Sequence, residues 1–347
     1  MPIKLNPHRT FAVNENKGNY MKISVVCPVY NTQPEILNTA IDSIKKQTGQ
    51  HTIEVIIVDD GSTLEATIST LGTMESCCSN IKIIRSENYG PAHARNLGIK
   101  NSSYDWIGFI DADDIWPEDK LRLHEGVLNV HPNASWIIGN CEILKENSQI
   151  ESPSLSAIIS AGIVSSVSKR FTSPDTTKAL IYHSRHLGTC IIKKGTLIDI
   201  GGFNEALKYG EDWLLFLKLS TKTDIEYIEK VTYILRRQGR KSMMHSGGRL
   251  SSKYILSSKL AQKEQCLLFI KRELKWYRYV QIKEVAMNNL LNKKPFKALY
   301  FSIKAWLGSP TDLKELLFFI NVLSTKNKST AKVLLGKYCS AEQVDLN

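Results

Sequence analysis

Residues 54–62 read EVIIVDDGS and residues 105–114 read DWIGFIDADD, two largely apolar runs that each end in acidic side chains. Continuous apolar runs of this length favour strands that are buried on both faces of a parallel sheet. Each acidic group would then lie where a buried strand leaves the sheet. The two stretches therefore predict an α/β fold with polar groups at its strand ends.

Strands and helices are expected to alternate over the first half of the chain. Helices are indicated by helical spacing or by a helix-starting Pro after Pro34, over 91–100 and after Pro117. The expected strands are 23–27, 54–58, 81–84, 105–110 and 135–138. Such alternation with short connections is typical of an open, mostly parallel sheet flanked by helices.

In such sheets the ligand crevice lies beyond the carboxyl ends of the strands. Polar clusters follow three of the expected strands, at residues 28–31, 59–62 and 111–114. The sheet would bring the three clusters to one edge, which predicts a binding site there.

The alternation weakens after residue 148 in a Ser-rich stretch and resumes near Gly188. A helix is expected from about Glu211 and a strand over 231–235, and from residue 252 onward the pattern is helical only. We therefore expect a flexible arm over 1–20, an α/β domain over 21–250 and an all-helical extension over 251–347.

The extension carries almost all of the net charge of +11, since residues 251–347 hold 17 Lys and Arg against 7 Asp and Glu, a net of +10. A uniformly basic nucleic-acid-binding protein would not show this asymmetry, so we expect no nucleic-acid partner. The tail is either a solvated helical face or a surface for anionic lipid or an acidic acceptor. The pattern leaves the oligomeric state open.

The N-terminal residues lack the apolar core of a signal peptide, and no apolar run reaches the roughly 18–20 residues that cross a bilayer. We therefore expect a cytoplasmic protein, with the basic tail as a possible peripheral contact to membrane. The seven cysteines show no metal-binding spacing, and Cys27, Cys141 and Cys190 lie in apolar runs, so we expect them to pack as small hydrophobes.

Asp111 and Asp113 are alternate carboxylates at the end of a buried strand, which is costly unless a positive group compensates them. Mg²⁺ or Mn²⁺ bridging a diphosphate would do so, because both ions favour carboxylate and phosphate oxygens. An EF-hand is excluded because Trp116 stands where its loop needs Gly. Asp114 is expected to cap the turn that holds Pro117.

Other phosphate-binding classes are disfavoured by the first turn, which reads CPVYNTQPE over residues 27–35. A dehydrogenase would need GxGxxG there, and a nucleotidyltransferase a Gly-rich loop with Lys or Arg. Further along the chain, Glu211 and Asp212 begin a helix. They could stabilise its dipole, or a carboxylate there could take a proton from an acceptor hydroxyl.

Taken together, the motifs resemble the family 2 glycosyltransferases. They occur in order over residues 22–245 as ISVVCPVYN, IIVDDGST, ENYGPAHARNLGI, WIGFIDADD, GGFNE and GEDW. The resemblance implies a GT-A fold, a nucleotide-diphosphate sugar donor such as a UDP-sugar, an inverting transfer to a saccharide or lipid-linked acceptor, and a divalent metal. A non-catalytic relative that only binds sugar or nucleotide is the main alternative.

The resemblance also implies roles for individual residues. Asp212 matches the catalytic base, and Asp111 and Asp113 match the metal-binding triplet, with Asp113 as the direct ligand. The segment 233–246, YILRRQGRKSMMHS, resembles the family's closing Arg-rich strand and loop, which makes Ser242 a donor-site candidate and His245 a donor or metal candidate. The implied donor-binding residues are Pro28, Tyr30, Asn31, Asp60, Arg95, Asp111, Glu211 and Arg237.

Overall fold

The computed structural model describes residues 20–145, 150–151, 170–171, 186–237 and 256–271, together with positions 274, 275, 277, 278, 281, 282 and 285. These residues fall into two compact units. Unit 1 holds the described residues up to 171 together with 186–199 and 223–236, and unit 2 holds 200–222 and those from 237 onward. The predicted arm and domain boundaries remain predictions.

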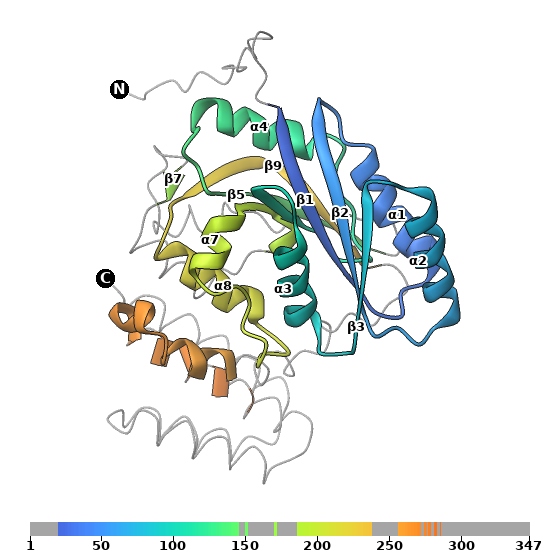
Figure 1. The fold of residues 1–347 in the computed structure, drawn as a ribbon. Coiled ribbons are helices and arrows are strands. Elements are labelled where there is room, and N and C mark those ends of the chain that lie inside the picture. The colour runs from blue at the N-terminus through green and yellow to red at the C-terminus, as the bar shows by residue number, and fades with distance from the viewer. Residues whose placement is uncertain are drawn as a thin grey trace. The chain divides into compact units, whose positions relative to one another are not determined.

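The first half of unit 1 is a parallel sheet in the order β3-β2-β1-β4 (Figure 1). Its strands are β1 (Met21–Val29), β2 (His51–Asp60), β3 (Ile81–Ser86) and β4 (Trp106–Phe109). All four coincide with strands expected from the sequence. The pairing places Val29 beside Asp59, so the first two polar clusters lie at one edge of the sheet.

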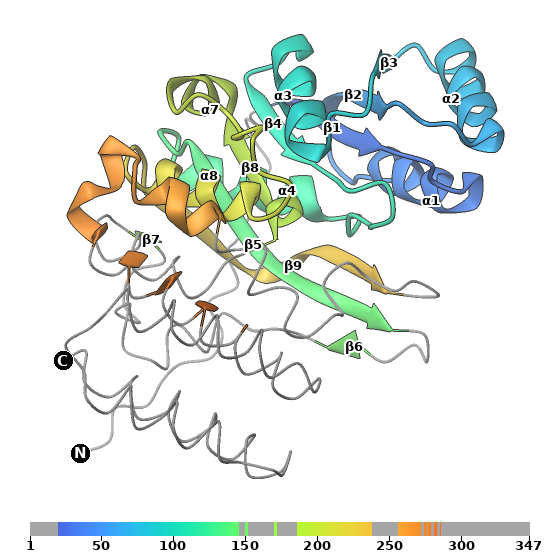
Figure 2. The same ribbon diagram turned by 90° about the horizontal axis from the view of Figure 1, so that it is seen from below.

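Antiparallel strands extend the sheet beyond β4, giving the order β4-β8-β5-β9-β7, with β6 paired to β5 (Figure 2). They are β5 (Trp136–Lys145), β6 (Ile150–Glu151), β7 (Arg170–Phe171), β8 (Cys190–Lys193) and β9 (Ile225–Arg237). The resulting nine-stranded mixed sheet places β8 and β9 near the end of β4.

Helices cover both faces of the parallel half. Along β2, Val55 and Ile57 pack into the core formed with α1, α2 and α4, whereas Ile56 and Val58 pack against Ala94 of α3. Because side chains alternate across a strand, the apolar run at 54–58 serves both faces at once. The helices of unit 1 are α1 (Pro34–Lys45), α2 (Glu65–Cys77), α3 (Pro91–Asn101), α4 (Lys120–Val130) and α7 (Lys194–Asp199), with the short 3₁₀ turn η1 (Leu187–Thr189).

Three cysteines expected in the core, Cys27, Cys141 and Cys190, are buried free thiols. Helix α2 was not expected from the sequence. Its buried face consists of Thr67, Leu71 and Met74, with polar residues between them, so it gives little apolar periodicity.

Unit 2 contains α8 (Glu211–Ser220) and the 3₁₀ helix η2 (Gln265–Ile270), which contact each other. Trp213 of α8 stacks on Tyr277 with ring centroids 5.3 Å apart. Residues 256–261 are helical, as expected, whereas the part of the predicted all-helical extension beyond residue 285 lies outside the described residues. Among the residues that the structure describes, no helix has both the length and the apolar content needed to cross a bilayer.

Candidate functional site

The carboxyl ends of β1, β2 and β4 form the floor of the candidate site in unit 1. The chain leaves β1 through Asn31, whose φ of 48° lies in the left-handed region. The Asn31 carboxamide oxygen accepts the N–H groups of Thr63 and Leu64, both at 2.8 Å, and the Asn31 N–H donates to Ser62 Oγ at 2.9 Å. Asn31 therefore ties the first polar cluster to the second, while the neighbouring Tyr30 is half exposed at 51%.

The two acidic side chains that end β2 are buried and have different roles. Asp59 accepts the N–H of Ser62 at 3.0 Å and so shapes its own turn. The Asp60 carboxylate accepts the N–H groups of Tyr89 and Gly90 and thereby fixes the start of α3. Burial raises the pKa of Asp60, and these two hydrogen bonds offset part of that effect.

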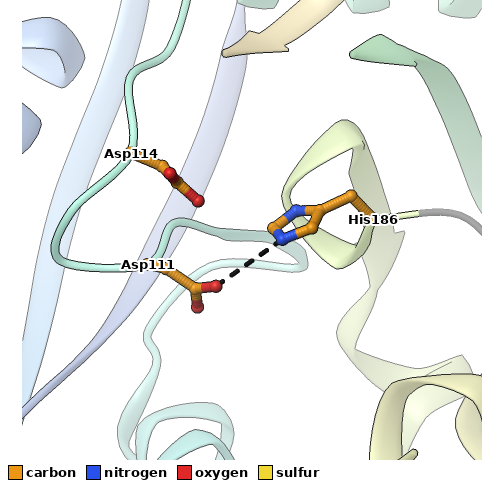
Figure 3. Close-up of side chains that lie close together, drawn as sticks. All are labelled: Asp111, Asp114 and His186. Carbon is orange, nitrogen blue, oxygen red and sulfur yellow. Dashed lines mark ion pairs between the residues drawn. The ribbon is translucent and has the colours of Figure 1, made fainter. Parts of the chain in front are cut away.

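Residues 111–114 form an acidic loop after β4, in which Asp111 and Asp113 are partly exposed and Asp114 is buried. Arg95, a buried side chain of α3, donates to Asp111 Oδ1 at 2.9 Å. His186 Nε2 lies 3.7 Å from the other carboxylate oxygen (Figure 3). Burial alone would raise the pKa of Asp111, but the charges of Arg95 and His186 and the Arg95 hydrogen bond outweigh it, so the pKa lies below its usual value.

Asp114 does not cap the turn at Pro117, and that prediction was wrong. Its buried carboxylate instead accepts the Tyr233 hydroxyl at 2.9 Å and the backbone N–H of Arg236 at 2.9 Å, both from β9. Burial, followed by the charges of Asp111 and Asp113, raises the pKa of Asp114 well above its usual value; the bonds from Arg236 and Tyr233 oppose this rise.

Asp111, Asp114 and His186 form a group that could hold a metal ion, with one potential ligand atom of each lying within 4.8 Å of the others. Figure 3 shows the three side chains converging on one region. Two carboxylates and one imidazole suit Mn²⁺ and tolerate Mg²⁺. Burial and then the charges of Asp111 and Asp113 raise the pKa of Asp114, and a cation would oppose both effects, so the residues present fit such an ion.

The hydrogen bonds of His186 limit how it can act. His186 Nδ1 accepts the N–H of Gly188 at 3.2 Å, which puts the proton of a neutral ring on Nε2, facing Asp111. In this state the Nε2–H lies 3.7 Å from Asp111 Oδ2, too far for a hydrogen bond. His186 becomes a cation ligand when the proton moves to Nδ1 and the bond from Gly188 is given up.

The other predicted residues are distributed over both units. Pro28 lies within β1, and Asp113 lies in the acidic loop, where its backbone oxygen accepts Arg236 Nε at 2.7 Å. Glu211 and Asp212 form the first turn of α8, and Arg237 ends β9; all three belong to unit 2. Ser242 and His245 lie outside the described residues. The roles of these residues in binding and catalysis, including Asp113 as a metal ligand, remain predictions.

Residues 24–155, which contain the acidic loop and the strand ends described above, match the family described as Glycosyl transferase family 2. These residues of the chain form a glycosyltransferase family 2 domain. The nine-stranded sheet is that of the GT-A fold, in agreement with a crystal structure of S. aureus TarS 1-349 in complex with UDP-GlcNAc. That structure has a TM-score of 0.57 and 18% sequence identity, and the match covers 92% of each chain.

Relatives by sequence are also glycosyltransferases by name. An uncharacterized glycosyltransferase of Rickettsia conorii is 33% identical over 64% of this chain and 34% of its own length. The Escherichia coli protein WfgD, a UDP-Glc:alpha-D-GlcNAc-diphosphoundecaprenol beta-1,3-glucosyltransferase, is 35% identical over 36% of this chain and 48% of its own length. The chain spans about a third of the length of the Rickettsia conorii relative and of a similar relative from Rickettsia felis.

Sequence reasoning missed three residues of this family 2 site: His186, Tyr233 and Arg236. All three lie outside the stretch that matches the family. Tyr233 and Arg236 belong to a strand that was predicted, so a search for polar groups on that strand could have found them. His186 precedes a three-residue 3₁₀ turn and carried no sequence signal of its own.

Proposed function

We propose that the chain is an inverting, metal-dependent glycosyltransferase that moves a sugar from a UDP-sugar to an acceptor hydroxyl in the synthesis of a polysaccharide, glycolipid or other glycoconjugate. The observation that carries the proposal is the group of Asp111, Asp114 and His186 at the strand ends of a GT-A sheet. The UDP-GlcNAc in the TarS complex and the UDP-glucose and diphosphoundecaprenol in the name of WfgD support a UDP-sugar donor and a saccharide or lipid-linked acceptor.

The acidic loop would hold the cation. Asp111 and Asp113 are the proposed ligands, with Asp114 and His186 completing the group. A bound Mn²⁺ or Mg²⁺ would offset the charge that develops on the diphosphate leaving group. Arg95 donates a hydrogen bond to Asp111 Oδ1, which orients that carboxylate and lowers its pKa.

The strand ends would hold the rest of the donor. Asn31 and Asp60 fix the two turns beside which the exposed Tyr30 ring can receive the nucleoside. Pro28, Glu211 and Arg237 complete the proposed donor-binding set. Location at the cytoplasmic face of a membrane, through the basic tail, is part of the same proposal.

Asp212 is the proposed catalytic base. It takes the proton of the acceptor hydroxyl while that oxygen forms a bond to the anomeric carbon and the bond from this carbon to the diphosphate oxygen breaks. The attack comes from the face opposite the nucleotide, which inverts the configuration. A positioned general base contributes about 10²–10⁴-fold to the rate.

The experiment measures nucleoside diphosphate release from UDP-, GDP- and dTDP-sugars with Mn²⁺ or Mg²⁺. Thermal stabilisation by the same donors is followed in parallel. We expect a UDP-sugar to give both signals and Asp212→Asn to lower turnover by about 10²–10⁴-fold with stabilisation retained. Glu65→Gln, which likewise neutralises an acidic side chain in the first turn of a helix, is the matched control and should keep most of the turnover.

Three outcomes would contradict parts of the proposal. Release that survives a chelator and Asp113→Ala would overturn the metal. Equal loss of stabilisation and turnover in Asp212→Asn would assign Asp212 to donor binding. Stabilisation without release from any donor, in the presence of metal, would make the chain a non-catalytic relative.

A further inference from the structure

Tyr233 contacts all three residues of the candidate cation group, which are Asp111, Asp114 and His186. Its hydroxyl accepts the backbone N–H of Asp111 at 3.0 Å and donates to Asp114 Oδ2 at 2.9 Å. Its ring stacks on His186, with centroids 4.7 Å apart and planes 24° apart. The side chain is fully buried. No strand end or motif recognised in the sequence accounts for these contacts.

The Tyr233 ring packs closely against the 3₁₀ turn at Gly188. A Cβ added to Gly188 would lie 2.0 Å from Tyr233 Cε2, so only glycine lets the 3₁₀ turn after His186 pass the ring at this distance. On the far side of the turn, Lys120 Nζ donates to the Gly188 carbonyl oxygen at 2.9 Å. The turn that carries His186 is thus held between Lys120 and Tyr233.

Strand β9 is in turn fixed to the acidic loop. Ile115 and Ile234 exchange backbone hydrogen bonds at 3.0 and 2.9 Å in an antiparallel bridge. The Arg236 guanidinium donates to the backbone oxygens of Asp113 and Ile36, at 2.7 and 2.8 Å. These bonds fix the position from which Tyr233 reaches the loop.

We propose that Tyr233 is a positioning residue that sets the spacing of Asp111, Asp114 and His186 for a divalent cation. The inference rests on the proposed function, because it concerns the proposed cation group. One hydroxyl accepts from the loop backbone and donates to the Asp114 carboxylate, and phenylalanine can do neither. Removing the hydroxyl leaves the Asp111 N–H and one Asp114 oxygen without their shared partner. The position of Asp111 relative to the Asp114 carboxylate is then no longer fixed by this pair of hydrogen bonds.

The test compares Tyr233→Phe with Tyr227→Phe. Tyr227 is also a largely buried residue of β9, and its hydroxyl donates to Asn140 Oδ1 at 2.7 Å, so both variants lose a hydroxyl bond on one strand. Binding of Mn²⁺ to the full chain is measured by electron paramagnetic resonance, with and without UDP. We expect Tyr233→Phe to weaken Mn²⁺ binding about 10–100-fold, as loss of an outer-shell partner does, and Tyr227→Phe to leave it unchanged.

Wild-type affinity for Mn²⁺ in Tyr233→Phe would overturn the inference and leave the proposed function intact. Equal weakening in both variants would also overturn it, because the effect would then be one of strand stability. Absence of Mn²⁺ binding by the wild type, with or without UDP, would overturn the cation site and the inference together. If Tyr233→Phe fails to fold, Gly188→Ala is the second variant, because its added Cβ displaces the Tyr233 ring while the hydroxyl is kept. Unchanged Mn²⁺ affinity in Gly188→Ala would equally refute the inference.

Discussion

Lys120 begins α4 with a fully buried side chain, an unusual environment for an ammonium group. Its Nζ donates to Gly188 O and lies 4.7 Å from the centroid of the Trp116 ring. Among the described residues no carboxylate forms an ion pair with it. Burial lowers the pKa of Lys120 from its ordinary 10.5 to about 7.

This pKa has a defined consequence for stability. Below pH 7 the side chain is charged in both states, and the folded state carries the full penalty. The penalty is about 5 kcal/mol, since the two pKa values differ by about three and a half pH units at ~1.4 kcal/mol each. Between pH 7 and 10.5 the unfolded state binds more protons than the folded state, so this group makes the free energy of unfolding rise with pH.

Lys120→Met removes the titration while keeping an unbranched side chain. We expect the free energy of unfolding of the wild type to rise by about 2 kcal/mol more than that of the variant between pH 7 and 9. Guanidinium unfolding followed by tryptophan fluorescence measures it, and Trp116 beside Lys120 is one of the six tryptophans that contribute to the signal. Lys46→Met, at an exposed lysine that ends α1, is the control for loss of a positive charge. Parallel wild-type and Lys120→Met curves over this range would refute a Lys120 that loses its proton near pH 7.

Two further substitutions test the packing and charge around the site. Arg95→Met removes the guanidinium that pairs with Asp111 and should lower the free energy of unfolding by about 1–3 kcal/mol. Excess Mn²⁺ should restore part of this loss. Equal losses of melting temperature with and without Mn²⁺ would contradict this expectation. Gly98→Ala would place a Cβ 2.3 Å from Val26 Cγ1, so we expect it to lower the free energy of unfolding by about 1–3 kcal/mol. Val26→Ala should partly relieve this loss in the double variant. Strictly additive losses in a double-mutant cycle would count against the close contact of α3 with β1.

The parallel half of the fold was predictable because its signals are local. Each of its strands contains a short, largely apolar run, and the polar clusters at 28–31, 59–62 and 111–114 directly follow three of those runs. Helix α2 was not predictable in this way, since its contact with the core is made partly by Thr67, whose hydroxyl donates to Thr32 O at 2.8 Å. A polar residue with a buried hydrogen bond adds nothing to an apolar pattern.

The error over Asp114 has a different cause. A local reading favours a cap, because Asp is a common capping residue and Pro117 follows closely. The Asp114 carboxylate instead accepts hydrogen bonds from Tyr233 and Arg236, which are separated from it in sequence by 119 and 122 residues. A pairing over such a distance leaves no trace in the spacing around residue 114, and the same holds for His186 and Asp111.

The two halves of the sheet contribute different chemistry to the site. The parallel half supplies the acidic loop and Arg95, whereas β8, β9 and the turn before β8 supply His186, Tyr233 and Arg236. Three carboxylates lie within four residues of the chain, and the positive groups that contact this loop include Arg95, Arg236 and, when protonated, His186. Hydrogen bonds from β9 orient Asp114 and oppose the rise of its pKa, but burial and the charges of Asp111 and Asp113 outweigh them. The antiparallel strands therefore position the side chains around a group of carboxylates that the parallel half supplies, and the chemistry of this group fits a divalent cation.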